Sequence, residues 1–136
     1  MEKLEHIGIA VKNLEESNKL FARLLGREHY KIEVVESEGV RTSFFKVGNV
    51  KIELLEATRP DSPIAKFIEK KGEGIHHIAF ETKNVNEDLK KYEADGFELI
   101  HQQAKAGADN KVIAFLHPKS TNGVLTELCQ EINASS

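Results

Sequence analysis

The stretch "LEHIGIAVKNLEESNKLFARLLG" (residues 4–26) returns in altered form as "IHHIAFETKNVNEDLKKYEADGFE" (residues 75–98), at an offset of 71 residues. In each copy an apolar run is followed by Lys-Asn and then, three residues after the Asn, by Glu. This pattern is typical of a helix start, because the Asn and the carboxylate satisfy otherwise unpaired N–H groups. The repeat therefore predicts two similar halves, each beginning with a strand and then a helix.

After each predicted helix come three short runs that are rich in β-branched and aromatic residues and are separated by turn residues. They are "YKIEVVE", "VRTSFFKV" and "VKIELLEA" in the first half, and "FELIHQQ", "KVIAFLHP" and "GVLTELCQ" in the second. Each half is therefore predicted to be a βαβββ module. We expect the first module at about residues 1–57 and the second at about residues 74–131.

A short helix is predicted between the two modules, in "RPDSPIAKFIEKKGEG". Ser62 stands at the N-cap, Pro63 at the first helical position and Gly72 just beyond the end, so the helix should span about residues 62–72. We interpret it as a connector inside one domain that covers residues 1–136. The predicted fold class is α+β, with tandem βαβββ modules.

The composition favours an ordinary globular protein. A chain of 136 residues with 40% hydrophobic and 30% charged residues can form one core. No apolar run approaches the roughly 18 residues of a membrane span, and "MEKLEHIGIA" lacks the features of a signal peptide. We therefore expect a cytoplasmic protein with no membrane partner. A net charge of −3 gives no global attraction for nucleic acid.

Cys129 is the single cysteine of the chain, so no intramolecular disulfide and no cluster of zinc-binding cysteines can form. We expect it to be a small residue of a strand.

The repeat places four polar residues at equivalent positions. His6 aligns with His77, and Glu53 aligns with Glu127 when the turn "PKSTNG" is allowed three extra residues. If the halves pair about a pseudo-twofold axis, these side chains converge as two imidazoles and two carboxylates. Such a set leaves two positions of an octahedral ion for water or substrate, and it suits one divalent Co, Ni, Mn, Fe or Zn ion per site. The alternative interpretation is that the four residues bind no metal and are ordinary residues of strands.

The alternation of a strand assigns the neighbours of the first His to two faces. His6 shares its face with Gly8 and Ala10, whose small size should leave room for a ligand. His76, the repeat equivalent of Glu5, falls on the face opposite to His77, so we assign His76 no chemistry.

At these residues the sequence resembles the vicinal oxygen chelate (glyoxalase) superfamily, in which tandem βαβββ modules form a cupped mixed sheet around a divalent metal. Within it the chain most resembles the methylmalonyl-CoA epimerase family, in "HIGIAV", "DSPIAKFIEKKGEGIHHIAFE" and "HPKSTNGVLTEL". The resemblance covers nearly the whole chain, and it implies a homodimer.

The resemblance implies that methylmalonyl-CoA is epimerised at its α-carbon through a metal-stabilised enolate. Glu127 is then a metal ligand that also serves as catalytic base. Some family members have Gln where this chain has Glu53, and some carry a second base, a Glu, where this chain has Thr42. The second base is therefore not identified, and Glu36 and Glu38 are substitutes to consider.

The phosphates of CoA need cationic or hydrogen-bonding partners. Lys119 and Ser120 in the "HPKS" turn are candidates, and His117 in the same turn could bond a substrate oxygen or brace the loop. Lys105 and Lys111 lie in or beside the last strands, and the alternative for all these lysines is a solvated surface position.

Two other functions remain as alternatives. Glyoxalase I (lactoylglutathione lyase) shares the order of ligands and differs in the linker helix and in the "HPKS" turn. A non-catalytic resistance protein that sequesters a small molecule would have the same fold without needing the four ligands.

Overall fold

The structure is a computed structural model, and it describes residues 1–132. The chain divides into two compact units. We call His6–His76 the N-terminal unit, and Met1–Glu5 together with the described residues from His77 onward the C-terminal unit. Two strands run from one unit into the other: β1 (Lys3–Ala10) and β5 (Gly74–Glu81). The unit boundaries thus differ from the predicted module boundaries, because the start of β1 belongs to the C-terminal unit.

The N-terminal unit has the predicted order of elements after β1. They are α1 (Leu14–Leu25), β2 (Lys31–Val35), the 3₁₀ helix η1 (Glu36–Glu38), β3 (Val40–Val47), β4 (Val50–Ala57) and α2 (Pro63–Lys71). Its strands are ordered β2-β3-β4-β1, with β1 parallel to β4 and the other pairs antiparallel. The first βαβββ module and the linker helix are therefore confirmed.

The C-terminal unit repeats this scheme after β5. Its elements are α3 (Val85–Ala94), β6 (Lys105–Ala106), β7 (Lys111–Leu116), the 3₁₀ helix η2 (Pro118–Ser120) and β8 (Thr126–Glu131). Its strands are ordered β5-β8-β7-β6, and β5 is parallel to β8.

The strand predicted at "FELIHQQ" is wrong. That segment makes only an isolated bridge between Leu99 and Leu116, and the short β6 comes later in the chain. The reason is a side chain: His101 Nδ1 accepts the backbone N–H of Phe115 at 3.0 Å, where a continuing ladder would supply a carbonyl oxygen.

The helix starts follow the predicted caps. The side chain of Asn13 accepts the N–H of Glu16 at 2.9 Å, and that of Asn84 accepts the N–H of Glu87 at 3.0 Å. Ser62 caps α2 in the same way. No helix within residues 1–132 is long and apolar enough to cross a membrane.

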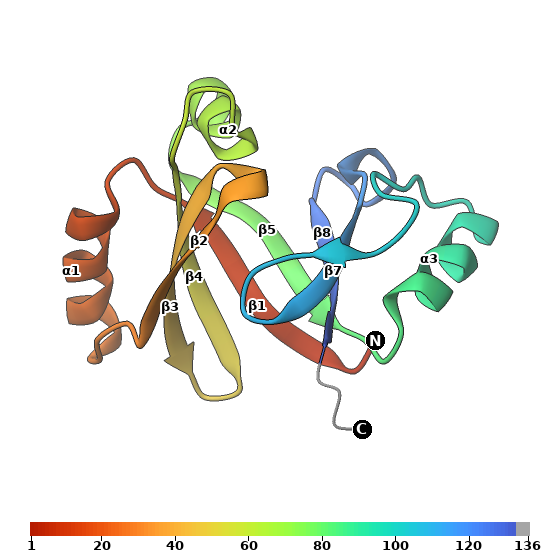
Figure 1. Cartoon of the computed structure of the whole chain (residues 1–136), viewed down its shortest axis with the longest axis horizontal. Coiled ribbons are helices and arrows are strands. Elements are labelled where there is room, and N and C mark those ends of the chain that lie inside the picture. Colours follow the sequence, from red (N-terminus) through yellow and green to blue (C-terminus); the bar gives the residue numbers. More distant parts are fainter. Residues whose placement is uncertain (133–136) are drawn as a thin grey trace. The chain divides into compact units, whose positions relative to one another are not determined.

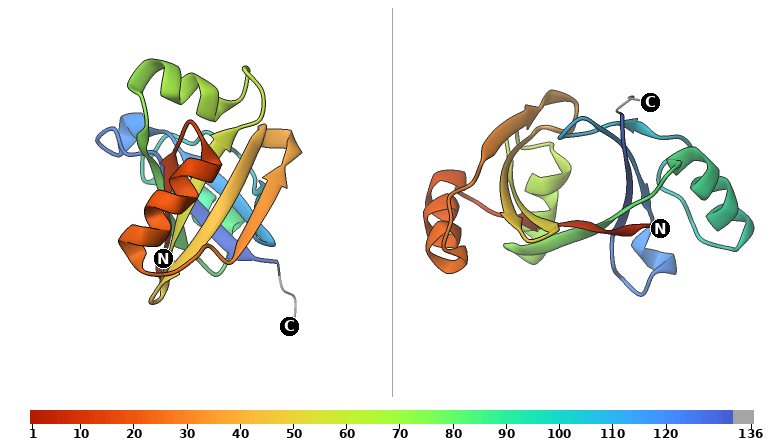
Figure 2. Two further views of the ribbon diagram at one scale, coloured as in Figure 1. Left: turned by 90° about the vertical axis from the view of Figure 1, so that its left-hand side faces the viewer. Right: turned by 90° about the horizontal axis from the view of Figure 1, so that it is seen from below.

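Two helices cover parts of both faces of the N-terminal unit. Helix α1 lies along the strands (Figures 1 and 2), and its side of the sheet holds one apolar cluster. That cluster contains Val11, Leu14, Phe45 and Leu54. On the opposite face, Ile64 of α2 packs with Ala10, Val40 and Leu55. The expected space beside Ala10 is therefore filled by the linker helix.

The C-terminal unit has the matching arrangement with α3 (Figure 2). Its helix-facing cluster contains Val85, Leu89, Ala114, Leu116 and Leu128. The other face carries a smaller cluster of Ala79, Ile113 and Cys129, against which Phe115 packs. In both units one face is thus occupied by the long helix, and the other is left to carry the polar candidates.

Candidate metal and substrate site

In the N-terminal unit, His6 and Glu53 lie on the face away from α1. Parallel pairing of β1 with β4 sets Gly8 opposite Glu53 and His6 opposite Lys51. Both candidates are about 5% exposed, and His6 Nδ1 lies 3.2 Å from Glu53 Oε2. Gly8 adds no side chain between them, which lets the imidazole and the carboxylate approach.

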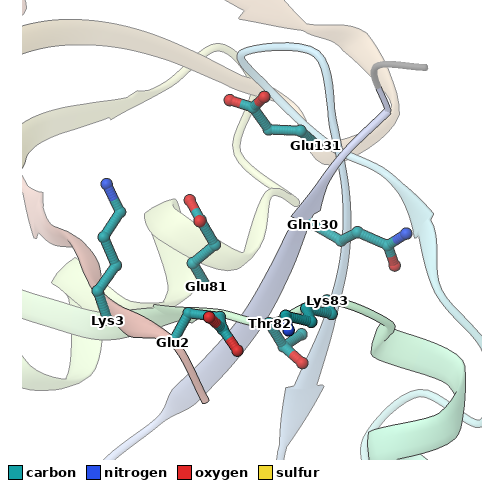
Figure 3. Close-up of a pocket in the computed structure, with 7 residues that line it drawn as sticks. All are labelled: Glu2, Lys3, Glu81, Thr82, Lys83, Gln130 and Glu131. Carbon is teal, nitrogen blue, oxygen red and sulfur yellow. The ribbon is translucent and has the colours of Figure 1, made fainter. Parts of the chain in front are cut away.

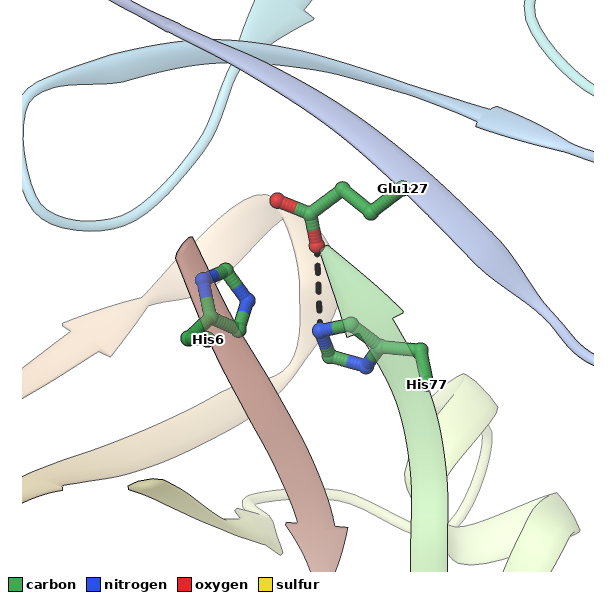
Figure 4. A group of neighbouring side chains, drawn as sticks. All are labelled: His6, His77 and Glu127. Atoms are coloured by element: carbon green, nitrogen blue, oxygen red, sulfur yellow. Dashed lines mark ion pairs between the residues drawn. The ribbon is translucent and has the colours of Figure 1, made fainter. Parts of the chain in front are cut away.

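In the C-terminal unit, His77 and Glu127 repeat the same register. Ala79 lies opposite Glu127, as Gly8 lies opposite Glu53. His77 Nε2 lies 3.0 Å from Glu127 Oε1, the contact that is dashed in Figure 4, and both residues are about 5% exposed. The predicted equivalence of the two pairs is therefore present in the strand pairing as well as in the sequence.

The spacing within each pair fits two adjacent ligands of one ion. Nitrogen and oxygen ligands stand roughly 2.0–2.2 Å from a metal such as zinc, so two of them at right angles are about 3 Å apart. A buried carboxylate also needs a cationic or hydrogen-bonding partner, since burial of an unpaired charge is costly. Each unit thus supplies one imidazole and one carboxylate whose chemistry and spacing suit a divalent transition metal.

Aromatic contacts orient the imidazole of the C-terminal pair. The ring of Phe115, which lies opposite Glu127 across β7 and β8, meets the His77 ring edge-on at 5.5 Å between centroids. Phe115 is in turn flanked by His101 at 5.8 Å. In the N-terminal unit, Phe44 takes the equivalent place opposite Glu53. We infer that these rings limit the rotation of the polar groups beside them.

Thr42 also lies on the face that carries Glu53. Antiparallel pairing sets Phe44 opposite Glu53 and Thr42 opposite Leu55, and residues two apart in a strand share a face. Thr42 is 2% exposed. No carboxylate therefore stands at this position, as the sequence indicated.

The loop that holds Glu36 and Glu38 is fixed by Arg59. Its guanidinium donates to the carbonyl oxygen of Glu36 at 2.7 Å and pairs with Asp61 at 2.8 Å. Gly39 permits this contact, because it adopts a φ of 63° and an added Cβ would lie 2.8 Å from Arg59 Cζ. Glu36 is exposed and Glu38 is half-buried. A role for either as second base stays a prediction.

The "HPKS" turn forms η2 and is braced from within. His117 Nδ1 accepts the N–H of Lys119 at 3.0 Å, and Ser120 Oγ accepts the N–H of Glu98 at 3.0 Å. Lys119 Nζ lies 3.4 Å from a carboxylate oxygen of Glu98. These contacts favour the loop-bracing interpretation of His117, and binding of substrate by this turn stays a prediction.

Lys111 was expected to be a solvated lysine or a CoA contact, and it is buried instead. It is 4% exposed, and its Nζ lies 3.8 Å from Glu5 and 3.6 Å from Glu131. The register of β7 with β8 puts Lys111 on the face of Glu127. The carboxylate of Glu5 therefore pairs with a lysine of that face. No local pattern of residues predicted the pair of Lys111 with Glu5, because the two residues are distant along the chain.

Two remaining histidine and cysteine predictions have clear outcomes. His76 packs edge-on against Phe67 of α2, with 4.9 Å between ring centroids, which is a structural role.

Cys129 is a buried strand residue as expected, and its Sγ donates to the carbonyl oxygen of Phe80 at 3.5 Å. Burial, followed by the nearby Glu127 charge, raises the pKa of the Cys129 thiol, so it stays protonated and unreactive at neutral pH.

The C-terminal unit has a pocket that is lined by none of the four candidate metal-binding residues (Figure 3). It is formed by the start of β1, the end of β5 and the end of β8. Its lining residues are Glu2, Lys3, Glu81, Thr82, Lys83, Gln130 and Glu131. Charges of both signs line it, and it contains neither His77 nor Glu127.

Comparison with known proteins assigns the family. Residues 5–115 match the family described as the Glyoxalase/Bleomycin resistance protein/Dioxygenase superfamily. The ethylmalonyl-CoA/methylmalonyl-CoA epimerase of Cereibacter sphaeroides is 37% identical over 94% of this chain and 97% of that protein. The chain belongs to the methylmalonyl-CoA epimerase family. The predicted resemblance and fold class are thereby confirmed.

Further similar proteins extend over nearly the same length. The uncharacterized protein YqjC of Bacillus subtilis is 42% identical over 96% of this chain and 93% of that protein. A solved structure of a Streptomyces coelicolor methylmalonyl-CoA epimerase variant, in complex with 2-nitronate-propionyl-CoA, has a TM-score of 0.94 and 36% identity. That match covers 100% of this chain and 99% of the other, so the two proteins share the fold.

Proposed function

We propose that this protein epimerises methylmalonyl-CoA at the α-carbon. The observation that carries the proposal is the buried His–Glu pair that occurs at the same register in both units of an epimerase-family fold. Relatives that are named as epimerases of malonyl-type acyl-CoA substrates, and one solved with an acyl-CoA ligand, support the same reaction class.

We further propose that His6, Glu53, His77 and Glu127 together hold one divalent metal ion. The donor set of each unit supports this assignment, and Co, Ni, Mn, Fe and Zn remain the candidate metals. When bound, such an ion supplies a Lewis acid that stabilises negative charge as it develops on the substrate oxygens. The α-hydrogen between a thioester and a carboxylate becomes more acidic in that environment.

The chain's own residues move the proton. In this proposal the carboxylate of Glu127 takes the α-proton, which general base catalysis makes roughly 10²- to 10⁴-fold faster. Inversion then requires that a proton return to the opposite face of the carbon. Some family members have a Glu on β3 for this step, but this chain has Thr42 there. Another group must therefore return the proton.

Substrate binding, assembly and location follow as further proposals. The η2 turn, through His117, Lys119 and Ser120, is proposed to contact the CoA portion, and the exposed Lys119 can exchange Glu98 for a phosphate. A homodimer and a cytoplasmic location stay predictions from the sequence.

The decisive test is proton exchange in heavy water. Protein loaded with a single metal is incubated in D₂O with one epimer of methylmalonyl-CoA, and deuterium at the α-carbon and the ratio of epimers are followed by NMR and chiral separation. We expect both exchange and inversion, and both should fall when the metal is removed with a chelator.

Two outcomes would contradict this function. Rapid loss of the methylglyoxal–glutathione hemithioacetal without exchange on methylmalonyl-CoA would favour glyoxalase I. Inactivity on both compounds, with tight binding of an unrelated small molecule, would favour a sequestering protein.

A further inference from the structure

The outer edge of β7 is flanked by an interrupted strand where it passes Phe115. The segment before β6 makes only an isolated bridge there, at Leu99. The carbonyl oxygen of Phe115 still accepts the N–H of Ile100 at 2.9 Å, but the N–H of Phe115 donates to His101 Nδ1 at 3.0 Å. A regular antiparallel pair would return that N–H to the carbonyl of Ile100. The imidazole of His101 therefore stands in for a strand carbonyl.

This hydrogen bond fixes where the His101 ring carries its proton. A ring nitrogen that accepts an N–H has no proton of its own, so Nδ1 is bare and the neutral imidazole holds its proton on Nε2. The bond also keeps the ring beside the Phe115 side chain, with 5.8 Å between centroids and 50° between planes. His101 thus contacts both the main chain and the ring of Phe115.

The Phe115 ring is also a neighbour of the candidate ligands. It meets the His77 imidazole edge-on, with 5.5 Å between centroids and 87° between planes. The residue itself lies opposite Glu127 across β7 and β8. The torsion that turns a His ring has broad preferences, so packing must select its angle. Phe115 supplies such packing, and at this angle His77 Nε2 lies 3.0 Å from Glu127 Oε1.

The N-terminal unit shows what the imidazole of His101 replaces. Phe44, the counterpart of Phe115, pairs with Lys31 of β2 on one side and with Glu53 of β4 on the other. It is fully buried, so continuous strands and the core hold its ring in place. Phe115 is half-buried and lacks a regular strand on its outer side. His101 supplies the support that β2 gives in the N-terminal unit.

We propose that His101 is a positioning residue: by accepting the Phe115 N–H it fixes the Phe115 ring, which sets the angle of the His77 imidazole. The inference rests on the proposed function, because it names what aligns the proposed pair of His77 and Glu127. His101 acts through Phe115 and neither gives nor takes a proton in the reaction. Partners that orient metal-binding groups are worth roughly 10- to 100-fold in metal affinity or activity, which sets the scale of the expected effect.

Two substitutions of His101 separate the acceptor from the ring. His101→Asn keeps an acceptor, because its amide oxygen can occupy the place of Nδ1, whereas His101→Phe keeps an aromatic ring and has no acceptor. At saturating metal, we expect His101→Phe to lower kcat on methylmalonyl-CoA about 10-fold and to leave KM within about 2-fold, because substrate binding is untouched. His101→Asn should keep kcat within about 3-fold of wild type.

Three measurements report the contact without substrate. NMR of the histidine ring nitrogens should find His101 with a bare Nδ1 and a protonated Nε2 in the wild-type protein. Amide exchange at Phe115 should be about 5-fold faster in His101→Phe, because a hydrogen bond is lost, and unchanged in His101→Asn. The Kd of the bound metal, measured by chelator competition, should rise about 10-fold in His101→Phe and stay within about 2-fold in His101→Asn.

Phe97→Leu is the matched control for the loss of an aromatic contact in the same unit. Phe97 meets the Tyr92 ring edge-on at 5.6 Å between centroids, and both rings pack on the cluster that faces α3. Phe97→Leu should lower Tm, because packing is lost, but keep kcat and the metal Kd within about 2-fold of wild type.

Several results would overturn the assignment. They are a protonated Nδ1 in His101, an unchanged amide exchange rate at Phe115 in His101→Phe, wild-type kcat and metal Kd in that variant, or failure of His101→Asn to retain activity. An equal loss of kcat in Phe97→Leu would reduce the effect to general destabilisation and would also overturn it. Absence of deuterium exchange in the wild-type protein would instead overturn the proposed function, while the NMR, the amide exchange and the metal Kd still decide the role of His101.

Discussion

The N-terminal and C-terminal units hold their His–Glu pairs at one register but surround them differently. In the N-terminal unit, Phe44 is fully buried and Ile64 of α2 packs over the same face. In the C-terminal unit, Phe115 is half-buried between two histidines, and a buried Lys111 lies on the face of Glu127. The repeat has kept the strand register of the two pairs, while the His77 pair meets its carboxylate through Nε2 and the His6 pair through Nδ1, and the residues around each pair differ.

The largest effect is expected from two separate variants, each of which lacks the candidate imidazole of one unit. His6→Ala and His77→Ala should each lower bound metal and exchange activity by at least about 10-fold, because a ligand is lost. Metal analysis after dialysis and the D₂O assay measure this. His76→Ala is the matched control next to His77, and it should retain metal because His76 packs on Phe67. Full metal content in His77→Ala would contradict the ligand assignment.

The next test asks whether the two carboxylates differ. Glu127→Gln should lower kcat by roughly 10²- to 10⁴-fold, because an amide cannot take the α-proton. Glu53→Gln should cost less than about 10-fold, since an amide oxygen still ligates the metal and no base is lost. Both variants are assayed at saturating metal. Equal losses would show that the two units share the proton transfer.

The aromatic residues opposite the carboxylates should separate stability from activity. Phe44→Leu should lower the free energy of unfolding by about 1–3 kcal/mol, because a fully buried ring leaves a cavity. Phe115→Leu should cost less stability and reduce kcat, because the ring that orients His77 is lost. Urea unfolding and steady-state kinetics measure the two effects. The reverse pattern would contradict the division into a packing unit and a polar unit.

The smallest effect concerns the charge network that joins α1 to β3 and β4 in the N-terminal unit. Arg41 bonds to Glu15 at 2.9 Å and to Glu56 at 2.8 Å, and its hydrogen bond lowers the pKa of Glu15. Glu56 and Glu15 in turn raise the pKa of Arg41. A lowered carboxylate pKa contributes stability above the unfolded-state value and loses it as the pH falls through the folded-state value.

Arg41→Gln should therefore lower Tm slightly at pH 7, and the difference from wild type should shrink as the pH falls below about 4. Thermal unfolding from pH 7 to pH 3 measures this. A difference that grows on acidification would have the wrong sign for this network.

Signals that are local in sequence predicted most of the fold. The caps at Asn13, Asn84 and Ser62 marked three helices, and strand alternation with the repeat selected His6 and His77. What the sequence did not predict depends on contacts between distant residues. His101 replaces a strand carbonyl at Phe115, and Ile64 fills the space beside Ala10.

The position of a buried charge was also beyond local reasoning. The burial of Lys111 requires a carboxylate that is 106 positions earlier in the chain, at Glu5.

Strand β1 has a consequence for the ancestry of the repeat. The start of β1 and the residues before it belong to the C-terminal unit: Glu2 donates its N–H to the carbonyl oxygen of Glu81 at 2.7 Å, and Glu5 pairs with Lys111. A fragment that begins at His77 would lack Glu5, which pairs with Lys111. A fragment that ends at His76 would contain the start of β1 without the unit to which it belongs. The two copies are alike in sequence, but the C-terminal unit depends for these contacts on the first residues of the chain.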